Sequence, residues 1–347
     1  MPIRHDRASR KLWTTLALIG GLAVFATTAQ AVEAGPDATG PGYEYYRVGN
    51  VDAPTPKPVA PGFALLGGGD WPVALFKRFV QQAGGGHIVV LRARGGRELQ
   101  DEIYQDVGGV QSVETLVIHD EEAAEDPKLL SIIAHADGIF FGGGDQSNYV
   151  RLWKGTSLNR ALDAHVTAGK PLGGTSAGLA ILGGYVYGCL DTVSLTSDEA
   201  LKNPTGGGVT LVRDFLHLPY LSKVITDSHF AIRHRLGRLV TWVGRLTQEE
   251  NDVTITGLGI DEGTGLWMDS AGIGTFYNEG QGYAWLVRPM KKPATIVAGK
   301  PLTYSAFQVV GIDPRSSLDL KTFKVIRPAF QQTVAVNRGA MTSNPEH

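Results

Sequence analysis

The stretch PLGGTSAG, residues 171–178, decides the fold class of this chain. Its first residues predict a short buried strand, and the residues from Ala177 onward predict a helix. Between them stands Ser176, inside the pattern G-x-S-x-G. In this pattern the serine occupies a strained turn that lifts its Oγ clear of the backbone, and the flanking glycines avoid Cβ clashes. The stretch therefore predicts an α/β fold in which Ser176 is a candidate nucleophile.

Apolar segments on both sides of this turn predict the rest of the sheet. We expect strands at residues 63–66, 87–91, 113–118, 137–141, 209–212, 224–226, 257–260 and 265–268, and helices at residues 71–83, 126–134, 158–168 and 229–244. Continuous apolar strands that alternate with helices are typical of a parallel sheet covered on both faces. The sequence therefore predicts a mostly parallel sheet with helices on both faces.

Composition divides the 347 residues into several parts. These are a signal peptide (1–31), an extended N-terminal segment (32–60), an α/β domain (61–290), a C-terminal β extension packed on the same domain (291–330) and a polar tail (331–347). Residues 1–31 contain basic residues, then a short apolar run, and then the small-x-small sequence AQA. This order is the pattern of a secretory signal peptide. We therefore expect an exported protein, periplasmic or extracellular, with no membrane contact after cleavage.

The overall charge and the cysteine count exclude several classes of protein. Lys and Arg number 32 and Asp and Glu 34, so the formal net charge is −2, and hydrophobic residues make up 43%. This balance excludes a disordered chain and a strongly basic nucleic-acid binder. Cys189, the single cysteine, is expected to be a small buried hydrophobic residue. The sequence has no Cys/His cluster of metal-ligand spacing, so we expect neither a metal nor a cofactor.

A nucleophilic serine needs a base, and the base needs an acid that orients it. His229 follows the predicted strand at 224–226, and strand ends are where α/β enzymes gather functional groups. His217 also stands in an apolar context, and position alone does not choose between the two histidines. The candidate acids are Asp191, Asp214, Asp227, Asp261 and Glu262. The last two end a predicted strand together, and the pattern does not separate them.

Glycines and arginines near these residues suggest how a reaction could be supported. The sequence GGGDQ at 142–146 follows a predicted strand, and its N–H groups could stabilise an oxyanion. On an ideal helix Arg233 lies one turn from His229, and an arginine there could hold a substrate carboxylate. Arg238 is expected on a solvated helix face. An ordinary α/β hydrolase is disfavoured, because its chain order is Ser, acid, His and the sequence HGGG does not precede Ser176.

Four motifs together resemble the cyanophycinases, in the serine peptidase family that also includes aspartyl dipeptidases. They are FGGGDQ (141–146), GTSAG (174–178), D-x-H-F-x-x-R-x-R-L-G-R (227–238) and GIDEGT (259–264). The resemblance runs from about residue 63 to residue 328. It implies a flavodoxin-like fold similar to that of class I glutamine amidotransferases, with the serine on a nucleophile elbow. It also implies a homodimer, because members of the family are commonly dimers.

The resemblance further implies a role for each candidate residue. Ser176 would be the nucleophile, His229 the base and Glu262 the orienting acid, and the N–H groups of Gly144 and Ala177 would form the oxyanion hole. The substrate pocket would comprise Gln146, Asp227, Ser228, Arg233, Arg235 and Arg238. The expected substrate is cyanophycin, a poly-aspartate with arginine on each side-chain carboxylate, which family members cut to β-aspartyl-arginine.

One position departs from the family pattern. The family usually has glutamine before the catalytic histidine, and this chain has Ser228. The shorter side chain removes an amide from the expected pocket. A peptidase of the same chemistry acting on other aspartyl or isoaspartyl peptides is therefore an alternative to cyanophycin hydrolysis. A catalytically silent binding protein on this scaffold is a second alternative, of a different class and independent of Ser228.

Overall fold

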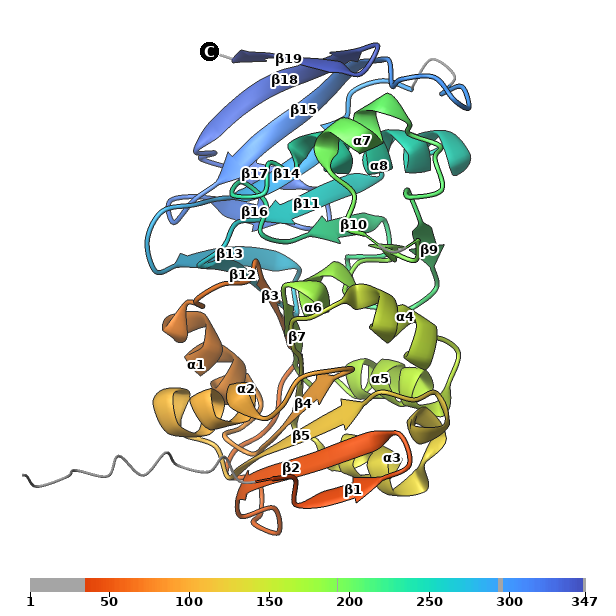
Figure 1. Ribbon diagram of the computed structural model, residues 1–347. Coiled ribbons are helices and arrows are strands. Elements are labelled where there is room, and N and C mark those ends of the chain that lie inside the picture. Colours follow the sequence, from red (N-terminus) through yellow and green to blue (C-terminus); the bar gives the residue numbers. More distant parts are fainter. Residues whose placement is uncertain (1–34, 192, 293–295, 346–347) are drawn as a thin grey trace, which may run out of the picture. The chain divides into compact units, whose positions relative to one another are not determined.

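The computed structural model describes residues 35–191, 193–292 and 296–345 (Figure 1). The predicted signal peptide at 1–31 lies outside these residues. The helices are α1 (Val73–Gln82), α2 (Glu98–Asp101), the π-helix η1 (Glu102–Val107), the 3-10 helix η2 (Glu122–Glu125), α3 (Pro127–His135), α4 (Gln146–Trp153), α5 (Ser157–Thr167), α6 (Ala177–Ala180), α7 (Ser197–Lys202) and α8 (Leu236–Glu249). Within the described ranges, none of them has the length and apolarity needed to cross a bilayer.

The larger sheet is built around parallel strands. Its order is β1 (Ala38–Gly40), β2 (Tyr43–Gly49), β5 (Ser112–Ile118), β4 (His87–Arg92), β6 (Gly138–Phe141), β7 (Leu172–Thr175), β3 (Gly62–Leu66), β12 (Thr264–Asp269), β13 (Ile273–Asn278), β16 (Ser317–Asp319) and β17 (Lys324–Ile326). The run from β5 to β3 is parallel, and every other neighbouring pair is antiparallel. The order β5-β4-β6-β7 is the 2-1-3-4 order of flavodoxin-like sheets. The predicted α/β fold is therefore confirmed, although antiparallel strands extend its parallel centre at both edges.

Helices cover both faces of the parallel strands (Figure 1). Successive residues of a strand point to opposite faces. Phe140 accordingly packs in one cluster with Phe76 and Phe79 of α1, whereas Phe141 packs in another with residues of α3 and α5. A strand buried on both sides must be apolar at every position, which is why these strands are uninterrupted apolar runs in the sequence.

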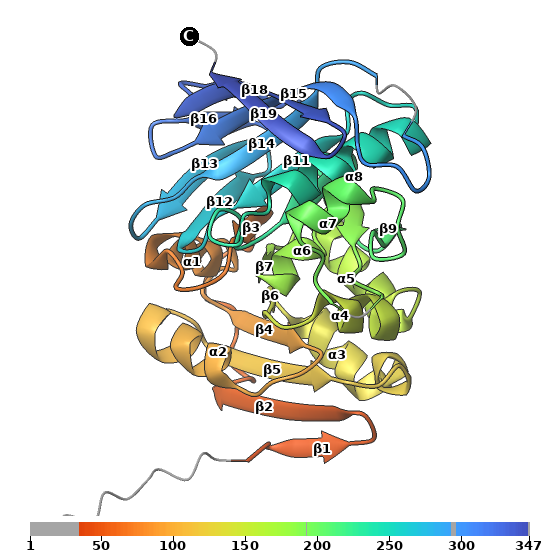
Figure 2. The ribbon, with the colours of Figure 1, turned by 45° about the horizontal axis from the view of Figure 1, so that its top comes forward.

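The second sheet contains most of the C-terminal half. Its order is β19 (Ala340–Pro345), β18 (Phe330–Asn337), β15 (Tyr304–Ile312), β14 (Ala284–Pro289), β11 (Thr256–Ile260), β10 (Val224–Asp227), β8 (Tyr185–Tyr187) and β9 (Leu211–Arg213). Among the described strands of this second sheet, the parallel pairs are β10 with β8 and β10 with β11. Figure 2 shows the C-terminal strands at the opposite end of this arrangement from β1 and β2. Leu258 and Leu286 of this sheet share a core cluster with Phe63 and Leu65 of the first sheet.

Two predictions about the ends of the chain need correction. Residues 331–347 were expected as a polar tail, but β18 and β19 form an antiparallel hairpin on the second sheet. Val334 and Val336 of β18 are buried, whereas the described side chains of β19 are exposed, so the segment is a strand pair with a single buried edge rather than a tail. The extended segment 32–60 likewise contains a hairpin, β1 and β2, which pairs with β5 through seven residues of β2.

Candidate active site

Ser176 occupies the turn that joins β7 to α6. Its φ is 55° and its ψ is −116°, a conformation that residues with a side chain rarely adopt. The glycines around it are required by close backbone contacts. A Cβ on Gly174 would lie 2.5 Å from the carbonyl oxygen of Gly178, and one on Gly178 would lie 2.3 Å from that of Phe141. The strand, turn and helix expected from the sequence are therefore present around Ser176.

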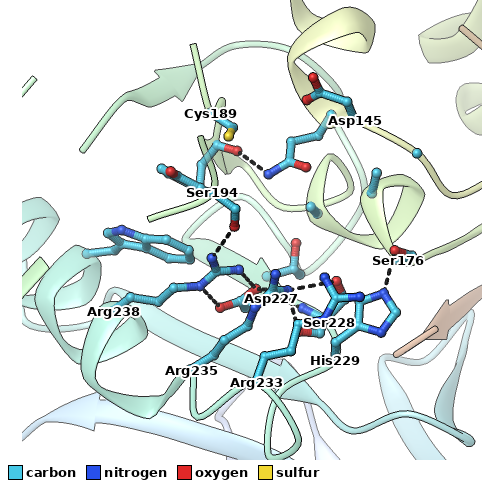
Figure 3. Close-up of a pocket in the computed structure, with 17 residues that line it drawn as sticks. Asp145, Ser176, Cys189, Ser194, Asp227, Ser228, His229, Arg233, Arg235 and Arg238 are labelled. Atoms are coloured by element: carbon cyan, nitrogen blue, oxygen red, sulfur yellow. Dashed lines mark hydrogen bonds and ion pairs between the residues drawn. The ribbon is translucent and has the colours of Figure 1, made fainter. Parts of the chain in front are cut away.

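His229 lies directly against Ser176. It follows β10 after one intervening residue, and its Nε2 is 2.6 Å from the Oγ of Ser176 (Figure 3). The loop after β3 packs against this residue, and the backbone N–H of His229 donates to the carbonyl oxygen of Gly67 at 2.7 Å. A Cβ on Gly68, whose φ is +97°, would lie only 2.4 Å from Cε1 of the imidazole. Only glycine lets this loop pack on the ring.

Glu262 completes a hydrogen-bonded row of three side chains. It lies in the loop between β11 and β12, and its Oε1 is in close contact with Nδ1 of His229. A carboxylate only accepts hydrogen bonds, so Nδ1 carries the proton and Nε2 is free to accept from the Ser176 hydroxyl. Burial lowers the pKa of His229, and the hydrogen bond to Glu262 opposes that shift. The imidazole is therefore neutral near pH 7, as a proton acceptor must be.

The other candidate bases and acids lie elsewhere. His217 is exposed and pairs with Asp163 at 2.8 Å. Asp261, next to Glu262 in sequence, accepts from the backbone N–H groups of Ala231 and Tyr283, each at 2.8 Å. It also accepts from the Trp285 indole at 3.0 Å. Consecutive residues point in different directions, so Glu262 contacts the imidazole and Asp261 does not.

Gly144 and Ala177 line the same pocket as Ser176. A Cβ on Gly143 would lie 3.3 Å from the Cβ of Ser176, so the turn after β6 packs closely against the serine. Gly144 has a φ of +138° and open space around it, and it lines the same pocket as Ser176 and Ala177. Ala177 is the first residue of α6, and the first N–H groups of a helix have no intrahelical acceptor. Both residues therefore border the cavity into which the Ser176 side chain opens.

A pocket of about 190 Å³ opens beside Ser176 and His229 (Figure 3). It is lined by the whole predicted set: Gln146, Asp227, Ser228, Arg233, Arg235 and Arg238. Sequence reasoning missed Tyr187, Ser194 and Trp242, which also line it. Trp242 is four residues after Arg238 on α8, a spacing that places two side chains on one helix face. Tyr187 and Ser194 come from other segments and carry no comparable signal.

Asp227 and Arg238 form a buried ion pair at the base of the pocket. Arg238 donates from Nε at 2.7 Å and from Nη2 at 2.5 Å to the two carboxylate oxygens of Asp227. Its Nη1 donates to Ser194 Oγ at 2.9 Å, and its guanidinium lies 4.8 Å from the Trp242 ring centroid. The expectation of a solvated Arg238 is therefore wrong: a buried carboxylate at the end of β10 provides the counter-charge that permits burial.

Arg233 and Arg235 supply positive charge that this ion pair does not neutralise. The exposed Arg233 has no hydrogen-bond or ion-pair partner for its side chain among the described residues. Arg235 is buried. Its Nη1 donates hydrogen bonds to the carboxylate of Asp227 at 3.2 Å and to the carbonyl oxygen of Ser228 at 2.7 Å. Burial lowers the pKa of Arg235 to about 10, so it stays charged at neutral pH. Two guanidinium groups beside the nucleophile suit a substrate carboxylate.

Cys189 is buried, as predicted, but it lies in the pocket wall. Burial raises the pKa of its thiol, so the neutral form predominates near pH 7. A protonated thiol is a weak nucleophile. Ser176 is therefore the better-placed nucleophile of the pocket.

The sequence is similar to a peptidase family and to cyanophycinases. The family model of Peptidase family S51 matches residues 98–274, which include Ser176, His229 and Glu262. A cyanophycinase of Synechococcus elongatus is 31% identical over 219 residues, and one of Trichormus variabilis is 28% identical over 218 residues. These alignments cover 61% and 62% of this chain and 62% of each relative's length. The crystal structure of a peptidase from an acI-B1 actinobacterium aligns with a TM-score of 0.45 at 17% identity, over 82% of this chain and 97% of that one.

Proposed function

The chain belongs to peptidase family S51, and on that premise we propose that it is a serine-type peptidase with Ser176 as its nucleophile. The observation that carries the proposal is the row of Ser176, His229 and Glu262 at the mouth of an arginine-lined pocket. A binding protein would not need an imidazole held neutral and in hydrogen-bond contact with a serine hydroxyl. The catalytically silent alternative is disfavoured for that reason.

The mechanism follows from the hydrogen-bond directions. Ser176 Oγ attacks the amide carbonyl of the substrate while Nε2 of His229 accepts its proton. The resulting imidazolium continues to donate a hydrogen bond from Nδ1 to the carboxylate of Glu262. The backbone N–H groups of Gly144 and Ala177 stabilise the negatively charged oxygen of the tetrahedral intermediate. His229 then gives the proton to the leaving amine. Water, deprotonated by the same imidazole, releases the acyl group from the serine.

The proposed substrate is cyanophycin, cut as an exopeptidase to β-aspartyl-arginine. Similarity to cyanophycinases supports this choice, and so does the positive charge of Arg233 and Arg235, which suits the carboxylates of an aspartyl residue. Ser228 favours a second candidate. Its Oγ lies 3.4 Å from Arg235 Nη1, where the family's longer amide would fill more of the pocket. Other aspartyl or isoaspartyl peptides are therefore the alternative substrates.

Location and assembly are further parts of the proposal. The basic, apolar and AQA segments of residues 1–31 support export to the periplasm or the medium. The family resemblance supports a homodimer.

Degradation of insoluble cyanophycin tests the proposal. The purified protein is incubated with the polymer and with short aspartyl dipeptides, and the released products are identified by mass spectrometry. We expect β-aspartyl-arginine from the polymer and none from the Ser176→Ala variant. Cleavage of the dipeptides alone would replace cyanophycin by the second candidate, and absence of serine-dependent hydrolysis of either would overturn the peptidase assignment.

A further inference from the structure

A second cleft, of about 810 Å³, opens on the other side of the nucleophile. Ser176 and His229 line both this cleft and the arginine pocket. The remaining walls come from the loop after β3, the start of α1, the end of β4, the α2–η1 segment, the turn after β6, the end of β7 and the residue after β13. A peptide bound across Ser176 would therefore extend from one cavity into the other.

The two cavities carry opposite charge. Carboxylates of Asp70, Glu98, Glu102 and Glu279 line the second cleft, against the single guanidinium of Arg92. The arginine pocket presents three guanidinium groups against the two carboxylates of Asp145 and Asp227, so its formal charge is positive. A nucleophile between an acidic and a basic cavity fits a substrate with a cation on one side of the scissile bond and an anion on the other.

Two of the four carboxylates already have partners. Glu98 pairs with Arg92 at 2.5 Å, and Glu279 accepts from the N–H of Val73 at 2.9 Å, at the start of α1. In the described part of the chain, Asp70 and Glu102 have neither a hydrogen bond nor an ion pair. Partial burial raises the pKa of Glu102, and so do the nearby carboxylates of Asp106, Glu98 and Asp70. The cleft therefore holds negative charge that nothing in the described protein neutralises.

An independent observation also points to a ligand. Thr175, the residue before the nucleophile, is only 7% exposed and lines the acidic cleft. Its Oγ1 has no hydrogen-bond partner within the described residues. Buried polar atoms without partners are rare in folded proteins. The hydroxyl of Thr175 and the carboxylates of Asp70 and Glu102, which line the same cleft, are all groups that can accept a hydrogen bond from a cationic N–H donor.

We propose that the acidic cleft is a second substrate subsite that binds a guanidinium or ammonium group of the peptide, with Asp70 and Glu102 as its specificity-determining residues. The inference rests on the proposed peptidase function. It adds that the enzyme selects substrates charged at both ends, the arginine pocket holding a carboxylate and the acidic cleft holding a cation.

Three synthetic peptides made of two β-aspartyl-arginine units test this subsite. One carries arginine in both units, and the other two carry citrulline in one unit each. Citrulline keeps the shape of arginine and removes its charge. For the wild-type enzyme we expect one of the two citrulline peptides to lose about tenfold in kcat/KM, since its urea group still donates hydrogen bonds but lacks the charge that strengthens them. In the Asp70→Asn/Glu102→Gln variant, that loss should shrink to less than threefold.

Matched controls separate the possible failures. The Asp52→Asn/Glu121→Gln variant neutralises two exposed carboxylates that line neither cavity, and it should keep the full arginine preference. Labelling with a fluorophosphonate serine probe checks that each variant is folded and has a reactive serine. A wild-type protein that takes no label overturns the proposed function. A labelled enzyme that cleaves all three peptides equally, cleaves none, or keeps its preference in the Asp70/Glu102 variant overturns the subsite.

Discussion

Replacing Glu262 by glutamine tests how the imidazole is oriented. The amide is nearly isosteric with the carboxylate, so the loop between β11 and β12 should keep its conformation. The new NH2 group can donate to Nδ1 of His229, which would move the ring proton to Nε2. A protonated Nε2 cannot accept the proton of Ser176. Glu262→Gln therefore prevents His229 from acting as a base. It leaves the arginine pocket intact, because Glu262 does not line that pocket.

The expected size of the effect follows from two contributions. Loss of a charged hydrogen bond to the imidazolium is worth about 1.5–3 kcal/mol, or roughly 10- to 150-fold in kcat. The Glu262 side chain is 34% exposed, so solvent weakens the interaction and the lower half of that range is expected for Glu262→Ala. The wrong tautomer is an additional defect in Glu262→Gln, for which we expect a fall of about 10³- to 10⁴-fold. KM should change by less than about threefold.

Steady-state kinetics of both variants on one peptide substrate measure these quantities. The account predicts that the glutamine variant is slower than the alanine variant, although glutamine is the more conservative change. If both variants lost activity through KM with kcat intact, Glu262 would contribute to substrate binding rather than to orienting the base. A glutamine variant faster than the alanine variant would refute the tautomer argument.

Four further outcomes are expected. Arg233→Ala should raise KM about tenfold with little change in kcat, and an unchanged KM would remove Arg233 from the binding site. Gly68→Ala should lower kcat at least 100-fold while circular dichroism shows a folded protein, because its Cβ would displace the His229 ring; wild-type activity would contradict this packing. Asp227→Ala should lower the free energy of unfolding by about 3–5 kcal/mol in urea titrations, since Arg238 would be left buried without its counter-charge; a loss under 1 kcal/mol would argue against that. Burial lowers the pKa of His229, so the base stays neutral to more acidic pH, and kcat/KM should reach half of its plateau below pH 6.5; a midpoint above pH 7 would contradict the direction.

The parallel centre of the fold could be predicted because its strands are buried on both faces. Segments such as Ile88–Leu91 and Ile139–Phe141 are apolar at every position, and glycine-rich turns mark their ends. The hairpin of β18 and β19 could not be predicted in the same way. Only Val334 and Val336 of β18 are buried, and the short apolar run Val334–Val336 is flanked by the polar residues Thr333 and Asn337, so the pattern is too short to predict a strand.

The site was only partly accessible from the sequence. The turn at Ser176 was predictable because local backbone contacts dictate its glycines. The choice of His229 over His217, and of Glu262 over Asp261, depends on contacts between residues far apart in the chain, so local pattern left both choices open. The burial of Arg238 was missed for the same reason.

The most direct measurement of the central claim is the site of covalent labelling by a fluorophosphonate probe, mapped by mass spectrometry of proteolytic peptides. The account predicts a single adduct on Ser176, strongly reduced in His229→Ala and absent in Ser176→Ala. An unlabelled protein, or an adduct that persists in Ser176→Ala, would contradict the claim that a histidine-activated serine at the end of β7 is the nucleophile.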